Sequence, residues 1–342
     1  MSTAGLRTLS VVVPVYNSAA GLSRLVERLL PVLDSLSVPY EVVMVNDGSR
    51  DTSWDRLQEL SAAYPAIRCL NLMRNYGQHN ALLAGIRAAK GEVIVTMDDD
   101  LQNPPEEMPN LLAKMAEGYD VVYGPPLQEQ HGLWRDLASQ ITKLALESTM
   151  GAETARQVSA FRAFRTQLRD AFVTFQGPFV SVDVLLTWAT AKFAAVKVRH
   201  DPRAVGASQY TLRKLVTHAL NMMTGFSTLP LQLASWLGFS CTIFGLVVLA
   251  YVLGRFVMEG GSVPGFPFLA SVIAIFSGAQ LFALGIIGEY LARMHFRTMD
   301  KPAYAIRDAM GGERELLGGG VAMQGAVGPM RIARMPAGDA RE

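Results

Sequence analysis

The sequence predicts an α/β protein: a mostly parallel β-sheet with helices on both faces, followed by membrane-surface helices and a pair of membrane-spanning helices. Residues 6–125 alternate short apolar runs with stretches of helical periodicity, an order typical of βαβ units. Farther along, residues 234–257 contain one charged side chain, Arg255, and residues 266–287 contain none. Each of these two stretches is long enough to cross a bilayer core as a helix.

Five apolar runs in the N-terminal part are predicted strands, and four periodic stretches are predicted helices. The strands are residues 9–16, 41–47, 68–72, 92–98 and 120–123. The helices are residues 22–33, 52–64, 80–90 and 105–116. We expect Asp51 to cap the second helix and Gly91 to end the third in the C′ position.

Polar residues follow three of the predicted strands at the point where each strand ends. They are Tyr16-Asn17, Asp47-Gly48-Ser49 and the run Asp98-Asp99-Asp100. In open parallel sheets, ligands bind beyond the carboxyl ends of the strands. The sequence therefore predicts one binding site at this edge of the sheet.

The three consecutive aspartates predict a metal site. Because side chains alternate along a strand, we expect Asp98 and Asp100 to point the same way. Two such carboxylates repel each other unless a cation lies between them, and Mg²⁺ or Mn²⁺ prefers oxygen ligands shared with substrate phosphates. The alternative is that the acids only cap the helix that begins near Pro104.

The charges around the apolar stretches predict their orientation. Arg213 and Lys214 precede the first stretch, and Arg293, Arg297 and Lys301 follow the second. The positive-inside rule places both outer ends in the cytosol and the short connecting loop outside. Residues 1–10 lack a long apolar core, so we expect the first 200 residues and both termini to be cytosolic.

These patterns divide the chain into five parts. We expect a catalytic domain over residues 1–205, interfacial amphipathic helices over 206–233, membrane helices over 234–257 and 266–287, and a cytosolic C-terminal tail over 288–342. An ordinary packed helix is the alternative for residues 211–233. The net charge of +1 and the absence of a long basic stripe argue against nucleic-acid binding.

Several ordered motifs resemble the inverting family 2 glycosyltransferases with a GT-A fold. VVVPVYN, VNDGSRDTS and MDDDLQNPPEE stand where the signatures of that family stand. RNYGQHNA, LQNPPEE, GASQY and GEYLAR are similar to its polyprenyl-phosphate branch, which includes dolichol-phosphate mannose synthase. Within that branch, the chain most resembles the bacterial undecaprenyl-phosphate 4-deoxy-4-formamido-L-arabinose transferases. The similarity runs from about residue 9 to residue 305.

The resemblance implies three sets of site residues. Contacts with the donor nucleotide are expected from Pro14, Tyr16, Asn17, Asp47, Ser208 and Tyr210. The metal ion, Mg²⁺ or Mn²⁺, and the pyrophosphate are expected to bind Asp98, Asp100 and Gln102. The catalytic set implied is Asp100, Arg135, Arg162 and Arg203, in which the guanidinium groups suit phosphate.

The chain departs from the family pattern at four places. Ser18 replaces the usual acid after Tyr-Asn, and Gln209 replaces a lysine expected before Tyr210. Residues 156–159 (RQVS) stand where the family carries an aspartate proposed as the base, and Pro125-Pro126 follows Gly124 where an arginine is frequent. A phosphate acceptor whose second pKa is about 6 is already largely a dianion at neutral pH, so it can attack without a base.

The resemblance implies a metal-dependent, inverting transferase. We expect it to move a sugar from a nucleotide-sugar, UDP-linked, to undecaprenyl or another polyprenyl phosphate at the cytosolic face of the bacterial inner membrane. The lipid-linked product would serve modification of envelope glycans, and relatives suggest a homotetramer. The first alternative is a catalytically impaired scaffold that binds nucleotide or lipid. The second is a processive polysaccharide synthase, which two spans and the lack of a QxxRW motif disfavour.

Overall fold

The computed structural model describes residues 6–127, 157–177, 180–201, 229–259, 265–299 and 301–311. The strands are β1 (Leu9–Val15), β2 (Tyr40–Asn46), β3 (Ile67–Leu72), β4 (Val93–Thr96), β5 (Val121–Tyr123), β6 (Arg162–Arg165), β7 (Phe193–Ala195) and β8 (Ile306–Met310). The α-helices are α1 (Ala19–Ser35), α2 (Ser53–Ala63), α3 (Gln78–Ala88), α4 (Met108–Met115), α7 (Val182–Thr187), α9 (Leu229–Glu259) and α10 (Phe266–Thr298). Two 3₁₀ helices complete the described part, η1 (Pro105–Glu107) and η2 (Thr166–Phe172).

One sheet organises the described part of the domain, with the strand order β7-β5-β6-β4-β1-β2-β3-β8. The pairs β1–β2, β1–β4, β2–β3 and β5–β7 are parallel. The strands β6 and β8 run antiparallel to their neighbours. The predicted α/β class with a mostly parallel sheet is therefore confirmed.

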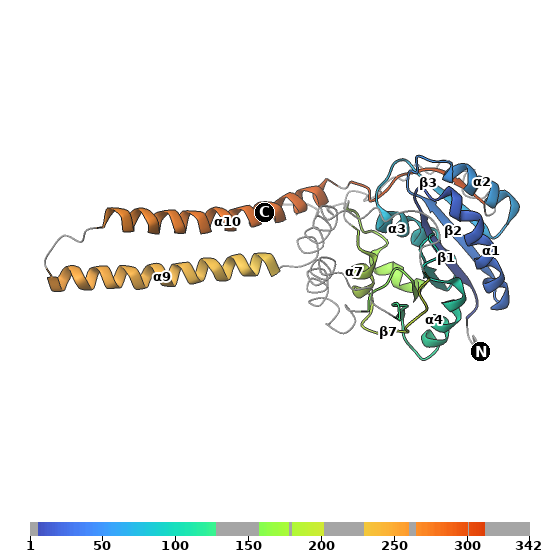
Figure 1. Ribbon diagram of the computed structural model, residues 1–342, viewed down its shortest axis with the longest axis horizontal. Helices are drawn as coiled ribbons and strands as arrows, with labels where there is room; N and C mark the ends of the chain where they lie inside the picture. Colours follow the sequence, from blue (N-terminus) through green and yellow to red (C-terminus); the bar gives the residue numbers. More distant parts are fainter. Residues whose placement is uncertain are drawn as a thin grey trace, which may run out of the picture.

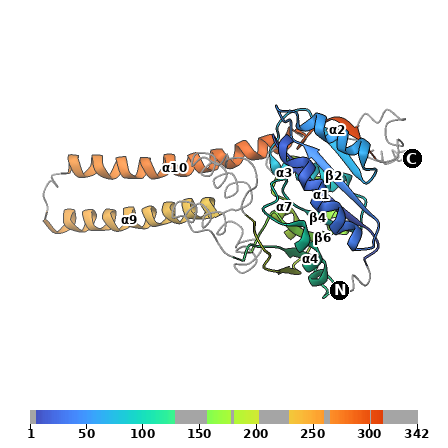
Figure 2. The ribbon, with the colours of Figure 1, turned by 45° about the vertical axis from the view of Figure 1, so that its right-hand side comes forward.

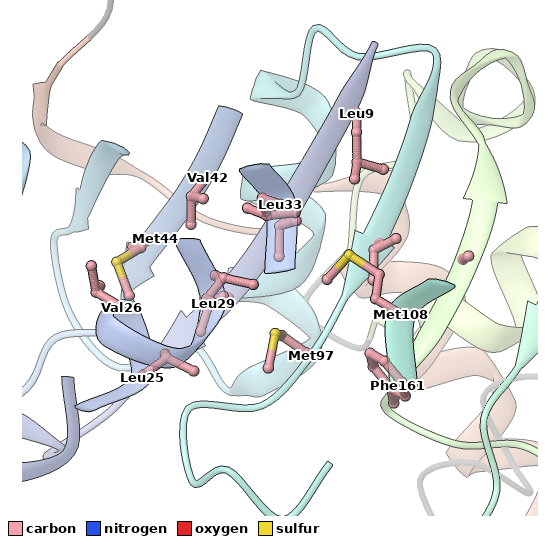
Figure 3. Close-up of a cluster of buried hydrophobic side chains, with 14 of the residues drawn as sticks. Leu9, Leu25, Val26, Leu29, Leu33, Val42, Met44, Met97, Met108 and Phe161 are labelled. Carbon is pink, nitrogen blue, oxygen red and sulfur yellow. The ribbon is translucent and has the colours of Figure 1, made fainter. Parts of the chain in front are cut away.

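Helices cover both faces of the sheet because side chains alternate along every strand. On one face, α1, α2 and α4 pack on a cluster that includes Leu29, Val42 and Met108 (Figure 3). On the other face, α3 and α7 pack on a second cluster with Val43 and Phe164. The four core residues predicted for α4, Met108, Leu111, Leu112 and Met115, are all buried.

Two local predictions were wrong. Strand β4 ends at Thr96, so Asp98 and Asp100 lie in the following turn and not on one face of a strand. Gly91 does not end α3 in a left-handed conformation; a Cβ atom there would lie 2.6 Å from the backbone of Leu9 and Ser10. This glycine is therefore required by a close approach of two backbone segments.

Three strands and one helix were not predicted from the sequence: β6, β7, β8 and α7. The most consequential is β8, because it lies in the segment that we assigned to the C-terminal tail. Met73 N–H donates to Ala305 O at 2.9 Å, and β8 pairs with β3 from Cys69 to Leu72. The chain therefore returns from α10 to the edge of the sheet.

The helices α9 and α10 run side by side and project away from the sheet (Figures 1 and 2). In the described residues, α9 alone contains a stretch long and apolar enough to cross a membrane, Leu231–Val248. Large apolar side chains such as Trp236, Phe244 and Leu281 are more than half exposed on the two helices. The apolar stretch of α10 is shorter, Phe276–Ala292, so the second predicted span remains a prediction.

The predicted interfacial helices lie almost entirely outside the described residues, since only residues 229–233 of that part belong to α9. Both membrane helices are longer than expected, because α9 begins at Leu229 and α10 continues to Thr298.

Candidate functional site

The end of β1 presents a half-exposed aromatic ring beside a polar turn. Tyr16 is 36% exposed, and Asn17 adopts a left-handed conformation with φ of 52°. Asn17 N–H donates to Ser49 Oγ at 3.0 Å, and its Oδ1 accepts from Arg50 N–H at 2.8 Å. The turns after β1 and β2 are thus tied together, as the sequence predicted.

Pro14 is buried in β1, at a position where its missing N–H breaks no ladder bond. The last β1–β4 pair is Val12 with Thr96, and Val12 O accepts from Met97 N–H at 3.2 Å. Pro14 faces the same neighbour two residues later, where β4 has already ended. The proline therefore stands where the sheet opens towards the site.

Asp47 is buried at the end of β2 and holds the loop that precedes α3. Its Oδ1 accepts from Tyr76 N–H at 2.7 Å and its Oδ2 from Gly77 N–H at 2.9 Å. Burial raises the pKa of this carboxyl, and the two backbone hydrogen bonds oppose the shift. Asp47 thus shapes the loop, a role that the sequence did not predict for it.

The three aspartates form a loop anchored at both ends by buried apolar side chains. Met97 lies in the cluster with Leu29 and Met108 (Figure 3), and Leu101 is 4% exposed. Leu101 adopts φ of 59°, an uncommon conformation for a leucine that is typical of functional loops. The anchors fix the backbone of the acidic loop.

Each aspartate of this loop has different surroundings. Asp98 Oδ1 accepts from Gln78 Nε2 at 2.6 Å, and Asp100 Oδ1 accepts from Gln102 N–H at 3.1 Å. Asp99 points inward near Ser18, and burial, with a smaller contribution from Asp100, raises the pKa of its carboxyl to about 6. The departure at Ser18 therefore puts a hydroxyl where a second acid would face Asp99.

Asp98 and Asp100 provide the hard oxygen donors that Mg²⁺ and Mn²⁺ prefer. Within the described ranges, no three or more His, Cys, Asp or Glu side chains converge on one point. Two carboxylates alone leave most of an octahedral coordination sphere to other oxygens. The donor set fits a cation that shares its ligands with substrate phosphates, rather than a fully protein-bound structural ion.

Gln102 connects the acidic loop to the segment that ends at residue 201. Its carbonyl accepts from Asp201 N–H at 2.8 Å. Arg28 joins the same region by a two-bond contact with Glu106, with Nη2 2.8 Å from Oε2, and lies 3.7 Å from Asp201. The described chain just before the predicted phosphate ligand Arg203 thus lies against the acidic loop.

Arg162 has a position different from the one expected. It is 1% exposed, its Nε donates to Thr96 Oγ1 at 3.0 Å, and its Nη1 pairs with Asp183. Tyr123 OH donates to the same Asp183 Oδ1 at 3.1 Å. A guanidinium enclosed in this way does not face a substrate phosphate, which corrects the predicted direct role.

Four predicted site residues lie outside the described residues: Arg135, Arg203, Ser208 and Tyr210. Two described residues at the site were not predicted, Gln78 and Asp183. Gln78 stands in the RNYGQHNA motif, whereas the only signal for Asp183 is a single acid in the apolar run VSVDVLL.

Comparisons with known proteins agree with this geometry. A family model described as "Glycosyl transferase family 2" matches residues 10–175. The chain is 35% identical over 313 residues to the undecaprenyl-phosphate 4-deoxy-4-formamido-L-arabinose transferase of Shewanella sediminis, which covers 89% of this chain and 93% of the relative. The enzyme of the same name from Pseudomonas savastanoi is 33% identical over 316 residues, covering 91% and 94%.

Among solved structures, the chain is similar to glucosyl-3-phosphoglycerate synthase from Mycobacterium tuberculosis, crystallised with Mn²⁺, UDP and glucosyl-3-phosphoglycerate. The TM-score is 0.50 at 22% identity, over 65% of this chain and 79% of that chain. At this identity the likeness concerns the fold.

Proposed function

The chain belongs to glycosyl transferase family 2, and we propose that it transfers a sugar from a nucleotide-sugar to undecaprenyl phosphate. The acceptor is proposed from the relatives, whose name includes it and which match about nine tenths of this chain. The observation that carries the proposal is the meeting of three strand-end segments at one edge of the sheet: Tyr16-Asn17, Asp47 and the acidic loop.

We assign the donor to this edge. The half-exposed ring of Tyr16 suits a base, and the loop that Asp47 holds lies beside it. Asp98, Asp100 and Gln102 would hold Mg²⁺ or Mn²⁺ together with the diphosphate. When bound, the cation neutralises the charge that develops on the leaving diphosphate. A UDP-linked donor is the best-supported choice, because the solved structure of similar fold contains UDP.

The acceptor phosphate can attack without a protein base. Its second pKa is about 6, so it is already largely a dianion at neutral pH. One of its oxygens forms the new bond to the anomeric carbon while the bond to the diphosphate breaks, which inverts the configuration. The chain's part is to place two anions in line, and Arg135, Arg203, Ser208 and Tyr210 are proposed for this by resemblance.

The long helices α9 and α10 place the site at a membrane in this proposal. Their exposed apolar side chains suit lipid, and α9 contains the spanning stretch. We propose a hairpin of two spans in the bacterial inner membrane, with the domain and both termini in the cytosol. A homotetramer and a role in envelope glycan modification belong to the same proposal.

A lipid-product assay tests the function. The full chain in detergent would receive undecaprenyl phosphate, Mn²⁺ and a panel of radiolabelled UDP- and GDP-sugars. We expect one donor to give a chloroform-extractable labelled product, with EDTA or Asp100→Ala abolishing it. Asp55→Ala, an exposed aspartate of α2, is the matched control and should leave the rate unchanged. No labelled lipid from any donor would overturn the proposal.

A further inference from the structure

The buried ion pair between Arg162 and Asp183 lies directly behind the acidic loop. Arg162 is the first residue of β6 and pairs in register with Thr96, the last residue of β4, and with Tyr123, the last residue of β5. In-register neighbours on adjacent strands point to the same face of a sheet. These three side chains therefore form a row on the face covered by α3 and α7, and the row ends two residues before Asp98.

Helix α7 brings Asp183 onto this row. Its carboxylate pairs with Arg162 Nη1 and accepts from Tyr123 OH at 3.1 Å, and it is buried at 6% exposure. Thr96 Oγ1 accepts from Arg162 Nε and donates to Ala160 O at 2.7 Å. Each polar group of the row thus has a partner, as a buried charge requires.

The charge of Arg162 also acts on Asp98. Desolvation opposes the charged form of Arg162, but Asp183 outweighs it, and Asp98 adds to the same effect, so the pKa of the guanidinium is raised. Asp98 is thus the next carboxylate to which this cation would turn. A cation that turned to Asp98 would compete with a metal ion for the same oxygens.

We propose that Asp183 is a positioning residue that holds Arg162 away from Asp98 and so keeps this carboxylate available to the divalent cation. The inference rests on the proposed function, because it assumes that Asp98 is a metal ligand. It assigns a role to Asp183 that acts through Arg162, without contact between Asp183 and the substrate.

The test measures Mn²⁺ binding directly, by the electron paramagnetic resonance signal of free Mn²⁺ in titrations of the full chain in detergent with UDP. Loss of a residue that orients a metal ligand typically weakens metal binding by about 10–100-fold. We expect Asp183→Asn to weaken binding within that range. Binding by Asp183→Asn as tight as in the parent overturns the inference.

Two further variants separate positioning from a purely structural role. Asp120 pairs with Arg165 at the opposite end of β6, with Arg165 Nε 3.4 Å from Asp120 Oδ1. Asp120→Asn therefore removes the same kind of pair far from Asp98, and we expect it to leave Mn²⁺ binding unchanged. The double variant Arg162→Gln/Asp183→Asn removes the competing cation as well, so it should bind Mn²⁺ more tightly than Asp183→Asn does. Equal binding by the single and double variants overturns the inference.

Tyr123→Phe covers the case in which Asp183→Asn does not fold. It keeps both charges and the buried ring but removes one hydrogen bond from Asp183. We expect a weaker loss of Mn²⁺ affinity in the same direction, and unchanged affinity would count against the inference. Failure of the parent itself to bind Mn²⁺ with UDP would instead refute the metal-dependent function.

Discussion

Asp47 and Tyr76 are joined by a hydrogen bond of 2.7 Å from the backbone N–H of Tyr76 to Asp47 Oδ1, which connects the end of β2 to the loop before α3. The second carboxylate oxygen accepts from Gly77 N–H at 2.9 Å. A carboxylate that accepts two backbone hydrogen bonds from consecutive residues fixes the course of a loop. The position of this loop beside Tyr16 and the acidic segment therefore depends on one buried side chain.

Asp47→Ala should loosen this loop and weaken donor binding. It leaves two backbone N–H groups without their acceptor, at a cost of about 2 kcal/mol in the free energy of unfolding. We expect the KM for the donor to rise more than kcat falls, because the loop shapes the binding site. Steady-state kinetics and thermal unfolding would measure the two effects. Asp55→Ala is the control, and a parent-like KM in Asp47→Ala would contradict the assignment of the donor to this edge.

Gly48→Ala should be more damaging than an alanine at another left-handed glycine. Gly48 has φ of 63°, and a Cβ there would lie 2.5 Å from the backbone carbonyl carbon of Arg74 and the nitrogen of Asn75. Gly118 has φ of 102° with nothing within 4 Å of its Cβ position. Conformational strain alone costs about 1 kcal/mol, whereas the added overlap should bring Gly48→Ala to at least about 3 kcal/mol.

Thermal unfolding of Gly48→Ala and Gly118→Ala side by side would isolate the steric part. Equal destabilisation would mean that residues 74 and 75 can move aside without cost.

The sequence predicted the helices and strands up to β5 because each has its own local pattern. The buried runs of β1 and β2 and the apolar face of α4 need no distant partner to be recognised. By contrast, β8 has exposed side chains throughout and is a strand only because β3 offers it a free edge. Its five residues carry no pattern that separates them from a loop.

The site shows the same division. The motifs located the strand-end cluster correctly, since polar residues directly after buried strands are a local signal. The burial of Arg162 was not readable, because it depends on Asp183, which lies 21 residues away on a short helix. The hydrogen bonds of Asp47 to the backbone of residues 76 and 77 likewise carry no sequence signature.

Asn80→Ala should release the segment that returns from α10 to the sheet. Asn80 Nδ2 donates to Ala303 O at 2.7 Å in a buried contact, and Ala303 is 2% exposed. We expect a loss of about 1–2 kcal/mol in stability and faster hydrogen exchange at Met73, whose N–H donates to Ala305 O. Asn110→Ala removes an exposed local bond to Glu107 and is the control. Unchanged exchange at Met73 would show that β8 is held without Asn80.

Glu41 provides a stability test far from the site, at the start of β2. Its Oε1 accepts from Ser10 Oγ at 2.7 Å and its Oε2 pairs with Arg68 Nη1 at 2.6 Å, with both side chains of the pair at most 15% exposed. The Lys90 N–H also donates to Oε1. Burial alone would raise the pKa of Glu41, but these hydrogen bonds outweigh it, and the pKa is lowered below 4.5.

Glu41→Gln should therefore destabilise the protein in a pH-dependent way. A carboxyl whose pKa is lower in the folded state adds stability above its unfolded pKa of 4.5, and that stability is lost as the pH falls through the folded pKa. We expect Glu41→Gln to cost about 2 kcal/mol at neutral pH, with the difference from the parent shrinking below pH 4.5. Thermal unfolding of both proteins across this pH range measures it. Glu59→Gln, at an exposed pair with Arg56, should cost little at any pH. A difference between parent and Glu41→Gln that persisted undiminished into acid would mean that the side chain acts through packing and not through its charge.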